Sequence, residues 1–516
     1  MKIIRPHVTL FFLAGLGIAC KGLMMIFPDE GINIAGYKLR FNERTAAEDS
    51  LQQRKIEDVG AFLAQFDSLN LATDSLSNDT TLEVKRNESV ASLQFANGDS
   101  SPLFSFFRAL DEAKSQNTRV HVFHYGDSQI ECDRMSNMIR EKLQNKFGGN
   151  GPGLISPVPI TASANIHQEQ SDNWKRYTSY GFDNGKVDHN NYGVMCSFGR
   201  FTAPLKAKSE PPTDTVSAWL EMRASGMSAA NCKIFTEAVI YFGNFTQPFQ
   251  LTLLTGGEMV SDEIIRPGEG VQRRSWTFPN TPKNVRFNFK GVESPDVYAI
   301  ELHGSSGINV SNIALRGNDG GAFRRVSNKS MKLVFDELHA DLFILQFGGN
   351  AVPFLKSQSS AEAYGNAFRE HIRKFKALAP DAAIIVVGPS DMSTSVDGVY
   401  QTWPYLEDLR NGMKKAALEE GCAFWDMYEV MGGKNSMVSW VTNNPPYAGP
   451  DYTHFTPAGA RKVAELLYRA IADEYDAWKS ASTGSETKTG SESEAGTEIE
   501  SKTVTKEMKS KETIVK

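Results

Sequence analysis

The feature of this sequence that most constrains its fold is an alternation of short apolar strands and helices, which occurs in two separate blocks. In the first block, the apolar run Arg119–Tyr125 (RVHVFHY) stands between helical patterns at Phe104–Gln116 and Glu131–Phe147. Strands that alternate with helices of this length form a parallel sheet with helices on both faces. The second block continues the same alternation: strands Asp341–Phe347, Ala383–Val387 and Cys422–Asp426, and helices Ser360–Leu378, Tyr405–Glu420 and Pro457–Trp478. Together the blocks predict one three-layer α/β/α domain, formed by residues 101–151 and 316–478.

Residues 152–315, between the two blocks, have a different character. They are rich in Gly, Asn, Pro and aromatic residues, and they contain short alternating runs such as Val285–Phe289 (VRFNF). Several short strands separated by turns are typical of a β-sandwich or jelly roll. We therefore expect a β-rich module that is inserted into the α/β domain. Its aromatic residues allow two interpretations, a sugar-stacking platform or sandwich core: Trp174, Tyr177, Tyr180, Tyr192 and Phe198.

The two ends of the chain differ from its middle. Basic residues precede an apolar run at residues 8–27, a pattern typical of an exported or membrane-anchored protein. We favour an uncleaved membrane anchor within residues 1–28, and the alternative is a lipoprotein that is acylated at Cys20. Residues 29–100 are predicted to be a helical approach segment and a polar linker. Residues 479–516 lack aromatic residues and are mostly Ser, Thr, Gly, Glu and Lys, which predicts a disordered tail.

Composition and missing motifs exclude several classes of function. The chain has 55 basic and 61 acidic residues, a balance that gives no broad electrostatic attraction for nucleic acid. It contains no G-x-x-x-x-G-K-[ST], H-E-x-x-H or C-x-x-C motif, which argues against the common nucleotide and zinc sites. We therefore expect no nucleic-acid partner, no metal and no cofactor. Of the five cysteines, only Cys196 and Cys232 share a β-rich segment, so this is the one disulfide that we consider.

Three short motifs follow predicted strands or precede predicted helices. Ser128 ends the sequence Gly-Asp-Ser after the first strand, where a helix start offers backbone N–H groups to a developing oxyanion. Asp451 stands three residues before His454, so its carboxylate can hold one imidazole nitrogen while the other accepts a hydroxyl proton. Asn350 follows a Gly pair, and its amide is a second candidate donor to an oxyanion. Each motif alone is also explained by a turn or a helix cap, but their joint occurrence predicts a nucleophilic hydrolase.

With these motifs the chain resembles the SGNH (GDSL-like) hydrolase family. The family's first block is similar to Gly126-Asp127-Ser128, its third to Gly348-Gly349-Asn350, and its fifth to Asp451 with His454. Its second block is one glycine, for which we choose Gly321, with Gly320 as the rival. The resemblance implies a flavodoxin-like sheet, Ser128 as nucleophile, and His454 as the base that Asp451 orients. It also implies an oxyanion hole built from the Ser128 and Gly321 backbone N–H groups and the Asn350 side chain.

The position of the insertion narrows the resemblance. An SGNH domain that is split after its first block is similar to the peptidoglycan O-acetylesterase branch, in which the insert resembles a carbohydrate-binding module. This implies a serine esterase that removes O-acyl, mainly O-acetyl, groups from an acylated polysaccharide or peptidoglycan. We expect it in the bacterial cell envelope, with its catalytic domain in the periplasm. Two alternatives remain open, a polysaccharide O-acyltransferase that uses the same site and a non-catalytic glycan-binding scaffold.

Overall fold

The structure is a computed structural model of the 516-residue chain, and it divides into two units that we describe separately. The first unit, Met1–Val84, contributes one small antiparallel hairpin, β1 (Ile32–Ile34) and β2 (Tyr37–Leu39). The second unit contains everything discussed below. The described residues are 32–34, 37–39, 91–181, 187–205 and 213–490.

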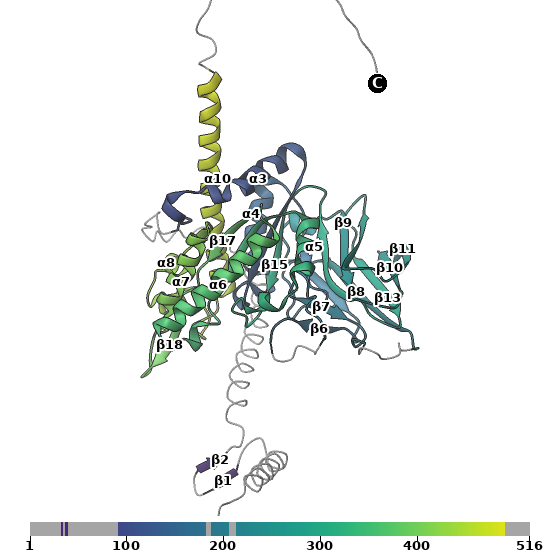
Figure 1. The fold of residues 1–516 in the computed structure, drawn as a ribbon, viewed down its shortest axis with the longest axis horizontal. Coiled ribbons are helices and arrows are strands. Elements are labelled where there is room, and N and C mark those ends of the chain that lie inside the picture. The colour runs from purple at the N-terminus through teal and green to yellow at the C-terminus, as the bar shows by residue number, and fades with distance from the viewer. Residues whose placement is uncertain (1–31, 35–36, 40–90, 182–186, 206–212, 491–516) are drawn as a thin grey trace, which may run out of the picture. The chain divides into compact units, whose positions relative to one another are not determined.

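A five-stranded parallel sheet forms the centre of the second unit (Figure 1). Its spatial order is β15 (Gly307–Ala314), β3 (Arg119–Gly126), β16 (Ala340–Gln346), β17 (Ala383–Val387) and β20 (Ala423–Trp425). Numbered along the chain, this is the order 2-1-3-4-5 of flavodoxin-like sheets. Nearly every residue of the three central strands is buried, because helices cover both faces of the sheet.

Side chains that alternate along each strand separate two hydrophobic cores. On β3, Phe123 and Tyr125 join the core under one set of helices, while Val120 and Val122 join the other. The first set is α5 (Asn328–Leu338), α6 (Gln358–Leu378) and α7 (Leu406–Glu419). The second set is α3 (Phe104–Gln116), α4 (Ser136–Phe147) and α10 (Pro457–Gly490). The predicted three-layer α/β/α domain is therefore confirmed.

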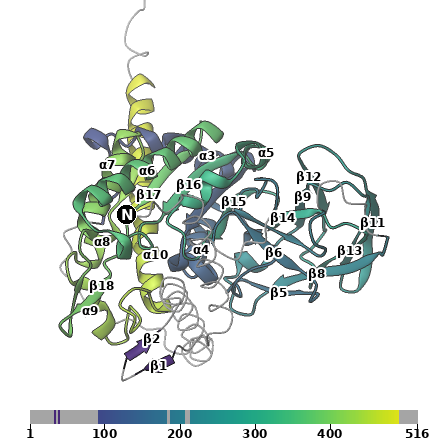
Figure 2. The same ribbon diagram turned by 60° about the horizontal axis from the view of Figure 1, so that its bottom comes forward.

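The inserted module is a sandwich of two antiparallel sheets (Figure 2). Apolar side chains of both sheets meet in a third core, which contains Leu220, Phe242 and Phe287. One sheet has, in spatial order, β11 (Glu258–Ile265), β10 (Phe249–Thr255), β13 (Val285–Gly291), β8 (Val216–Ala224) and β5 (Ile166–Gln170). The other sheet has, in spatial order, β12 (Val271–Thr277), β9 (Glu237–Gly243), β14 (Asp296–His303), β7 (Ser197–Arg200) and β6 (Lys175–Thr178). Strand β4 (Gly153–Ile155) also pairs with β14. The expected inserted β-sandwich is confirmed.

Two predicted boundaries need correction. The insertion does not extend to residue 315, because β15 pairs with β3 in the parallel sheet and the α/β domain therefore resumes at Gly307. The last helix does not stop at Trp478, because α10 continues to Gly490, into the stretch that we predicted to be disordered. The rest of that stretch, 491–516, lies outside the described residues.

The five aromatic residues of the early insertion are core residues. Each is 1–8% exposed, so the sugar-stacking interpretation is wrong. Trp174 belongs to the sandwich core, whereas the other four share one core with Tyr125 of the α/β domain and attach the module to it. Cys196 and Cys232 are both free thiols, so the disulfide that we considered is not formed.

The predicted N-terminal elements lie outside the region that the structure covers. Residues 8–27, Cys20, and most of the approach segment and linker are not among the described residues. Within the described residues, no helix has both the length and the apolar character needed to cross a membrane. The anchor therefore stays a prediction.

Candidate active site

Ser128 lies at the carboxyl edge of the sheet, just after strand β3. Strand β3 ends at Gly126, and Ser128 begins the 3₁₀ helix η4 (Ser128–Asp133). Asp127 caps this helix, because its Oδ1 accepts a hydrogen bond of 2.9 Å from the Gln129 N–H. The turn is tight, since a Cβ at Gly126 would lie only 2.9 Å from Ile130 and 3.1 Å from the Gln346 carbonyl oxygen. The sequence therefore places the serine where parallel α/β sheets bind their ligands.

The serine, histidine and aspartate form one chain of hydrogen bonds. Ser128 Oγ lies 2.8 Å from His454 Nε2, and His454 Nδ1 lies 2.6 Å from Asp451 Oδ2. The other carboxylate oxygen of Asp451 accepts the backbone N–H groups of Thr453 and His454, each at 3.0 Å. The carboxylate thus folds back onto the imidazole, as the spacing of three predicts. The structure brings together the three residues that we expected to react, although 326 positions separate Ser128 from His454.

The electrostatics of this chain favour proton transfer from the serine. Partial burial raises the pKa of Asp451, but the hydrogen bonds from His454 and from the backbone outweigh this and hold the pKa below its ordinary value. An ionised Asp451 favours the imidazole tautomer with its proton on Nδ1. The lone pair of Nε2 then faces the Ser128 hydroxyl, which is the arrangement that a general base needs.

Two residues that the sequence analysis missed hold the His454 loop. The buried Gln129 side chain donates to the Thr453 carbonyl at 2.6 Å and accepts from the Phe455 N–H at 3.3 Å, so it binds the backbone on both sides of His454. Arg134 Nη1 donates to the Phe455 carbonyl at 3.3 Å. The segment that carries the serine therefore fixes the position of the histidine. The one signal in the sequence is the position of Gln129 directly after Ser128.

Asn350 lies beside Asp127, the residue before the serine, on the loop that follows β16. Its Nδ2 donates to Asp127 Oδ2 at 3.0 Å and to the Asn318 carbonyl at 3.2 Å. The bond to Asp127 fixes the amide next to the Ser128 turn. Both N–H groups of the amide are therefore occupied, and Asn350 is a candidate oxyanion donor only if one of these two bonds is exchanged for the oxyanion.

The expected glycine of the oxyanion hole needs correction. The Gly321 N–H donates to Asp319 Oδ1 at 2.9 Å, and the N–H of its rival Gly320 donates to Asn318 Oδ1 at 2.8 Å. Both groups are occupied in a side-chain-capped turn at the start of η6 (Gly321–Arg325). Gly317, by contrast, has a φ of 71° and an N–H that is without a hydrogen-bond partner among the described residues. We therefore replace Gly321 by Gly317.

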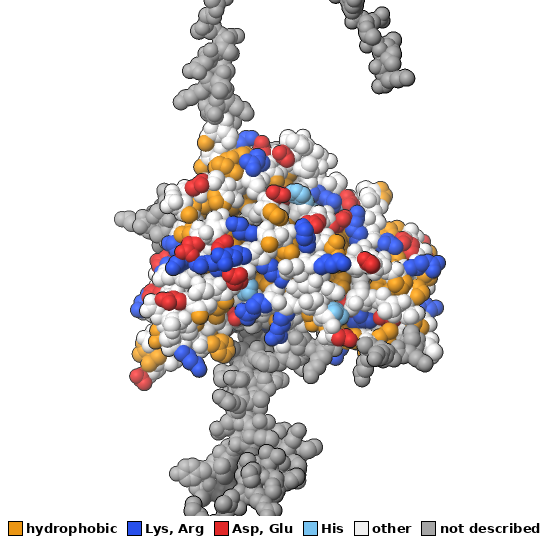
Figure 3. Space-filling model, in the orientation of Figure 1, with side chains coloured by type: hydrophobic (Ala, Val, Ile, Leu, Met, Phe, Trp, Pro, Cys, Tyr) orange, Lys and Arg blue, Asp and Glu red, His pale blue; other side chains and the backbone are white. Residues whose placement is uncertain are grey.

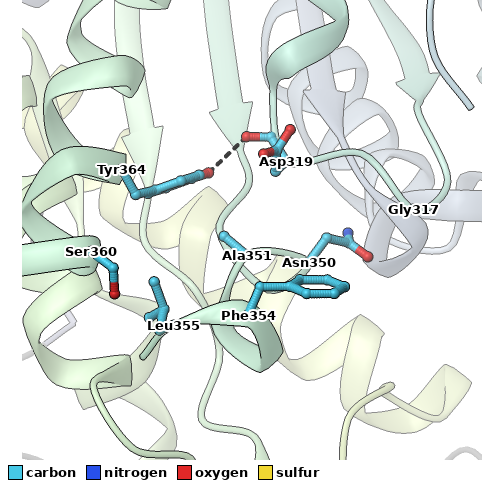
Figure 4. A pocket seen from close by; sticks show the side chains of 8 residues that line it. All are labelled: Gly317, Asp319, Asn350, Ala351, Phe354, Leu355, Ser360 and Tyr364. Carbon is cyan, nitrogen blue, oxygen red and sulfur yellow. Dashed lines mark hydrogen bonds between the residues drawn. The ribbon is translucent and has the colours of Figure 1, made fainter. Parts of the chain in front are cut away.

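Gly317 and Asn350 line the same cavity, of about 500 Å³ (Figure 4). One side of the cavity is formed by the loops that follow β15 and β16, and the opposite side is formed by α6. Tyr364 of α6 donates its hydroxyl to the Asp319 carbonyl at 2.8 Å, which ties the two sides together. The cavity gives a substrate access to the candidate oxyanion donors. Its lining residues are Gly317, Asp319, Asn350, Ala351, Phe354, Leu355, Ser360 and Tyr364.

Asp127 is a buried carboxylate that contacts both halves of the site. Burial raises its pKa to about 6, although the bonds from Gln129 and Asn350 and the nearby His454 favour its charged form. The ordinary value is 3.8, so between about pH 4 and pH 6 the folded protein binds more protons than the unfolded chain. Asp127 therefore lowers the free energy of unfolding as the pH rises through this window.

We expect Asp127→Asn to remove this pH dependence and to impair turnover. The melting temperature of the variant, relative to the wild type, should rise between about pH 4 and pH 7, because an amide has no proton to lose in this range. The new amide has one oxygen for the two donors that the carboxylate accepts, the Gln129 N–H and the Asn350 NH₂, so the turn or Asn350 loses a bond and kcat should fall. Melting curves across this pH range and kcat at neutral pH test both effects. A melting-temperature difference that does not vary with pH would contradict the assignment.

A comparison with known protein families gives a match to part of this chain. Residues 289–462 match the GDSL-like Lipase/Acylhydrolase family. The α/β domain is similar to the acylhydrolases of this family. The match includes Gly317, Asn350, Asp451 and His454, while Ser128 lies before it, on the other side of the inserted module. The GDSL-like domain is accordingly a hydrolase of carboxylic esters. A comparison with curated protein sequences gives no match.

Among solved structures, a peptidoglycan O-acetylesterase is similar to this GDSL-like protein. The TM-score is 0.55 at 19% identity, over 73% of this chain and 97% of that chain. Such a share is larger than the α/β domain alone, so the common fold includes the inserted module. Two further structures have TM-scores too low to support any inference. They are the acetyl xylan esterase AlAXEase (16% identity, 32% of this chain, 81% of that chain, TM-score 0.24) and a family two carbohydrate esterase from Cellvibrio japonicus (8%, 60%, 98%, 0.23).

Proposed function

We propose that the protein removes O-acetyl groups from an acetylated polysaccharide or peptidoglycan of the bacterial cell envelope, through an acyl-enzyme on Ser128. The observation that carries this proposal is the hydrogen-bonded chain Asp451–His454–Ser128, with contacts of 2.6 and 2.8 Å. The similarity to an acylhydrolase family supports the ester as substrate. The fold shared with a peptidoglycan O-acetylesterase supports an acetylated glycan as the carrier of that ester.

The mechanism has two steps, acylation of Ser128 and hydrolysis of the acyl-enzyme, and each passes through a tetrahedral intermediate. His454 Nε2 takes the proton of Ser128 as Oγ attacks the ester carbonyl carbon. The oxyanion accepts hydrogen bonds from the Ser128 and Gly317 N–H groups and from Asn350. The C–O bond to the sugar then breaks, and His454 returns its proton to the sugar oxygen. Water, deprotonated by His454, attacks the acyl-enzyme and releases acetate, while Asp451 remains ionised throughout.

We place this reaction in the cell envelope on the basis of the N-terminal sequence. The basic residues followed by the apolar run at 8–27 support an exported chain with a membrane anchor, or a lipoprotein acylated at Cys20. Its catalytic domain would then face the periplasm, where envelope glycans are accessible. Fractionation of cells that express the full chain, with protease added to spheroplasts, tests the proposal. A catalytic domain that stays protected from the protease would contradict it.

Acetate release from acetylated glycans tests the function directly. The full-length protein should release acetate from O-acetylated peptidoglycan or from a second acetylated polysaccharide, and Ser128→Ala should release none. A sugar acceptor should be included in a parallel reaction, because an acyl-enzyme also reacts with hydroxyl groups. If acetylated acceptor accumulates faster than free acetate, the reaction is transfer and the proposed hydrolysis is wrong.

We expect Asn350→Ala to lower kcat by roughly 10²–10³, the effect of removing one side-chain oxyanion donor. KM should change far less, because this donor acts on charge that exists only in the transition state. If Asn350 were only a turn residue, the substitution would lower the melting temperature and leave kcat unchanged. Steady-state kinetics with a chromogenic acetate ester and a melting curve on the same variant distinguish the two roles.

A further inference from the structure

An exposed tyrosine is stacked on the loop that carries the catalytic histidine. Strand β17 is followed by a small hairpin, β18 (Ser393–Val396) and β19 (Val399–Thr402). The Tyr400 ring of this hairpin lies on the Tyr452 ring, with centroids 3.6 Å apart and an interplanar angle of 9°. Tyr452 stands two residues before His454, and its carbonyl accepts the Ser393 N–H at 3.0 Å. The hairpin and the catalytic loop are therefore held together.

The hairpin side of this stack is exposed to solvent. Tyr400 is 41% exposed, and the valines on both sides of the hairpin turn, Val396 and Val399, are exposed as well. Apolar side chains gather over this hairpin, at the lower left of the molecule (Figure 3). Exposed apolar surface beside a reactive site is typical of a place where a ligand binds. A flat ring that is supported from below is suited to the apolar face of a sugar, which presents C–H groups to the π system.

A second exposed ring stands on the loop that carries Asn350. Phe354, at the end of η7 (Val352–Phe354), is 73% exposed, the highest value for a large apolar side chain among the described residues. Its ring lies beside Asn350 in the cavity described above, opposite the carboxylate of Asp319 (Figure 4). An aromatic ring and a carboxylate across one cavity are suited to the apolar face and the hydroxyl groups of a sugar, respectively.

The two rings are attached to two different loops of the candidate site. Phe354 follows Asn350 on the loop after β16, and Tyr400 stacks on Tyr452 of the loop that carries His454. His454 in turn is hydrogen-bonded to Ser128. A glycan that contacts both rings would therefore contact the two loops that hold Asn350 and His454.

We propose that Phe354 and Tyr400 are the two sugar-stacking residues of a glycan-binding cleft that presents the acetylated sugar to Ser128. The inference rests on the proposed function and adds to it the residues that select a polymeric carbohydrate over a small ester. The ligand class is a chain of pyranose rings with an acetylated hydroxyl group. Each ring is attached to a catalytic loop, so binding of the glycan and placement of its ester are coupled.

The test compares one polymeric and one small substrate in matched variants. Tyr400→Leu and Phe354→Leu remove the ring and keep an apolar side chain, while Tyr400→Phe and Phe354→Tyr keep the ring. With O-acetylated peptidoglycan or acetylated xylan, each leucine variant should lose about tenfold in kcat/KM, mainly through KM. With p-nitrophenyl acetate, which carries no sugar, each leucine variant should lose far less activity than it loses on the polymer. The ring-retaining variants should match the wild type on the polymer.

The outcomes separate this inference from the proposed function. If the leucine variants lose activity equally on both substrates, the residues support the catalytic loops and the inference is wrong. If they lose activity on neither substrate, the inference is also wrong, while the proposed function stands. A wild-type protein that cleaves p-nitrophenyl acetate and no acetylated glycan would overturn both. Melting curves of all four variants show whether a loss on both substrates comes from unfolding.

Discussion

Replacing Ser128 by alanine is expected to lower kcat by roughly 10⁶, the effect seen when a serine hydrolase loses its nucleophile. The reason is that the acyl-enzyme forms on Ser128 Oγ, and alanine has no oxygen in that position. His454→Ala should cost about as much, because a neutral serine hydroxyl without its base at 2.8 Å is a poor nucleophile. The double variant should be no worse than either single variant, since the two residues act as one unit. Steady-state turnover of p-nitrophenyl acetate measures all three.

A folded protein is required for this result to be informative. Ser128 Oγ makes one side-chain hydrogen bond, so its removal should leave the melting temperature close to that of the wild type. A serine-reactive phosphonate should label the wild type and fail to label Ser128→Ala. Near-wild-type kcat in His454→Ala would show that another group is the base. Equal labelling of the wild type and Ser128→Ala would show that the nucleophile is elsewhere.

Asp451→Asn is expected to lower kcat by roughly 10⁴, less than the loss of either partner. An asparagine at this position can still hydrogen-bond the imidazole, but its NH₂ group favours the tautomer with the proton on Nε2. That proton would point at Ser128 Oγ and remove the lone pair that accepts the serine proton. The imidazolium formed during the reaction would also lose its carboxylate partner at 2.6 Å.

Whether Asp451→Asn changes kcat or KM tests this explanation. KM for p-nitrophenyl acetate should change little, because Asp451 does not reach the ester in the proposed mechanism. Asp451→Ala provides a comparison, since it removes both the charge and the bonds to the Thr453 and His454 N–H groups. It should lower the melting temperature more than Asp451→Asn does. An Asp451→Asn variant with near-wild-type kcat would mean that the carboxylate only shapes the loop.

The sequence predicted the architecture wherever the spacing of apolar residues and the local composition distinguish strands from helices. Alternating strands and helices predicted the three layers, and runs such as Val285–Phe289 predicted the sandwich. The boundary at β15 was missed because Gly307–Ala314 (GINVSNIA) alternates apolar and polar residues, like the antiparallel strands just before it. Its pairing with β3, almost two hundred residues earlier in the chain, leaves no trace in local periodicity.

The candidate site was predictable in its motifs but not in its hydrogen bonds. The spacing of Asp451 and His454 determines how the carboxylate folds back, so the motif predicted that geometry. The replacement of Gly321 by Gly317 depends on which N–H groups the Asn318 and Asp319 side chains occupy, and several glycines in one short loop do not reveal it. The contacts of Gln129 join segments more than three hundred residues apart, and no local sequence pattern predicts them.

The insertion also determines when this enzyme becomes active during its synthesis. Strand β3 carries Ser128, yet both of its neighbours in the sheet, β15 and β16, follow the inserted module in the chain. A nascent chain that ends before Gly307 therefore has a nucleophile on an unpaired strand, and His454 emerges later still. The sandwich is continuous in sequence and can fold first, whereas the sheet must wait for contacts of very high sequence separation. Esterase activity is therefore expected only as the last step of folding, after the complete α/β domain has formed beside the module.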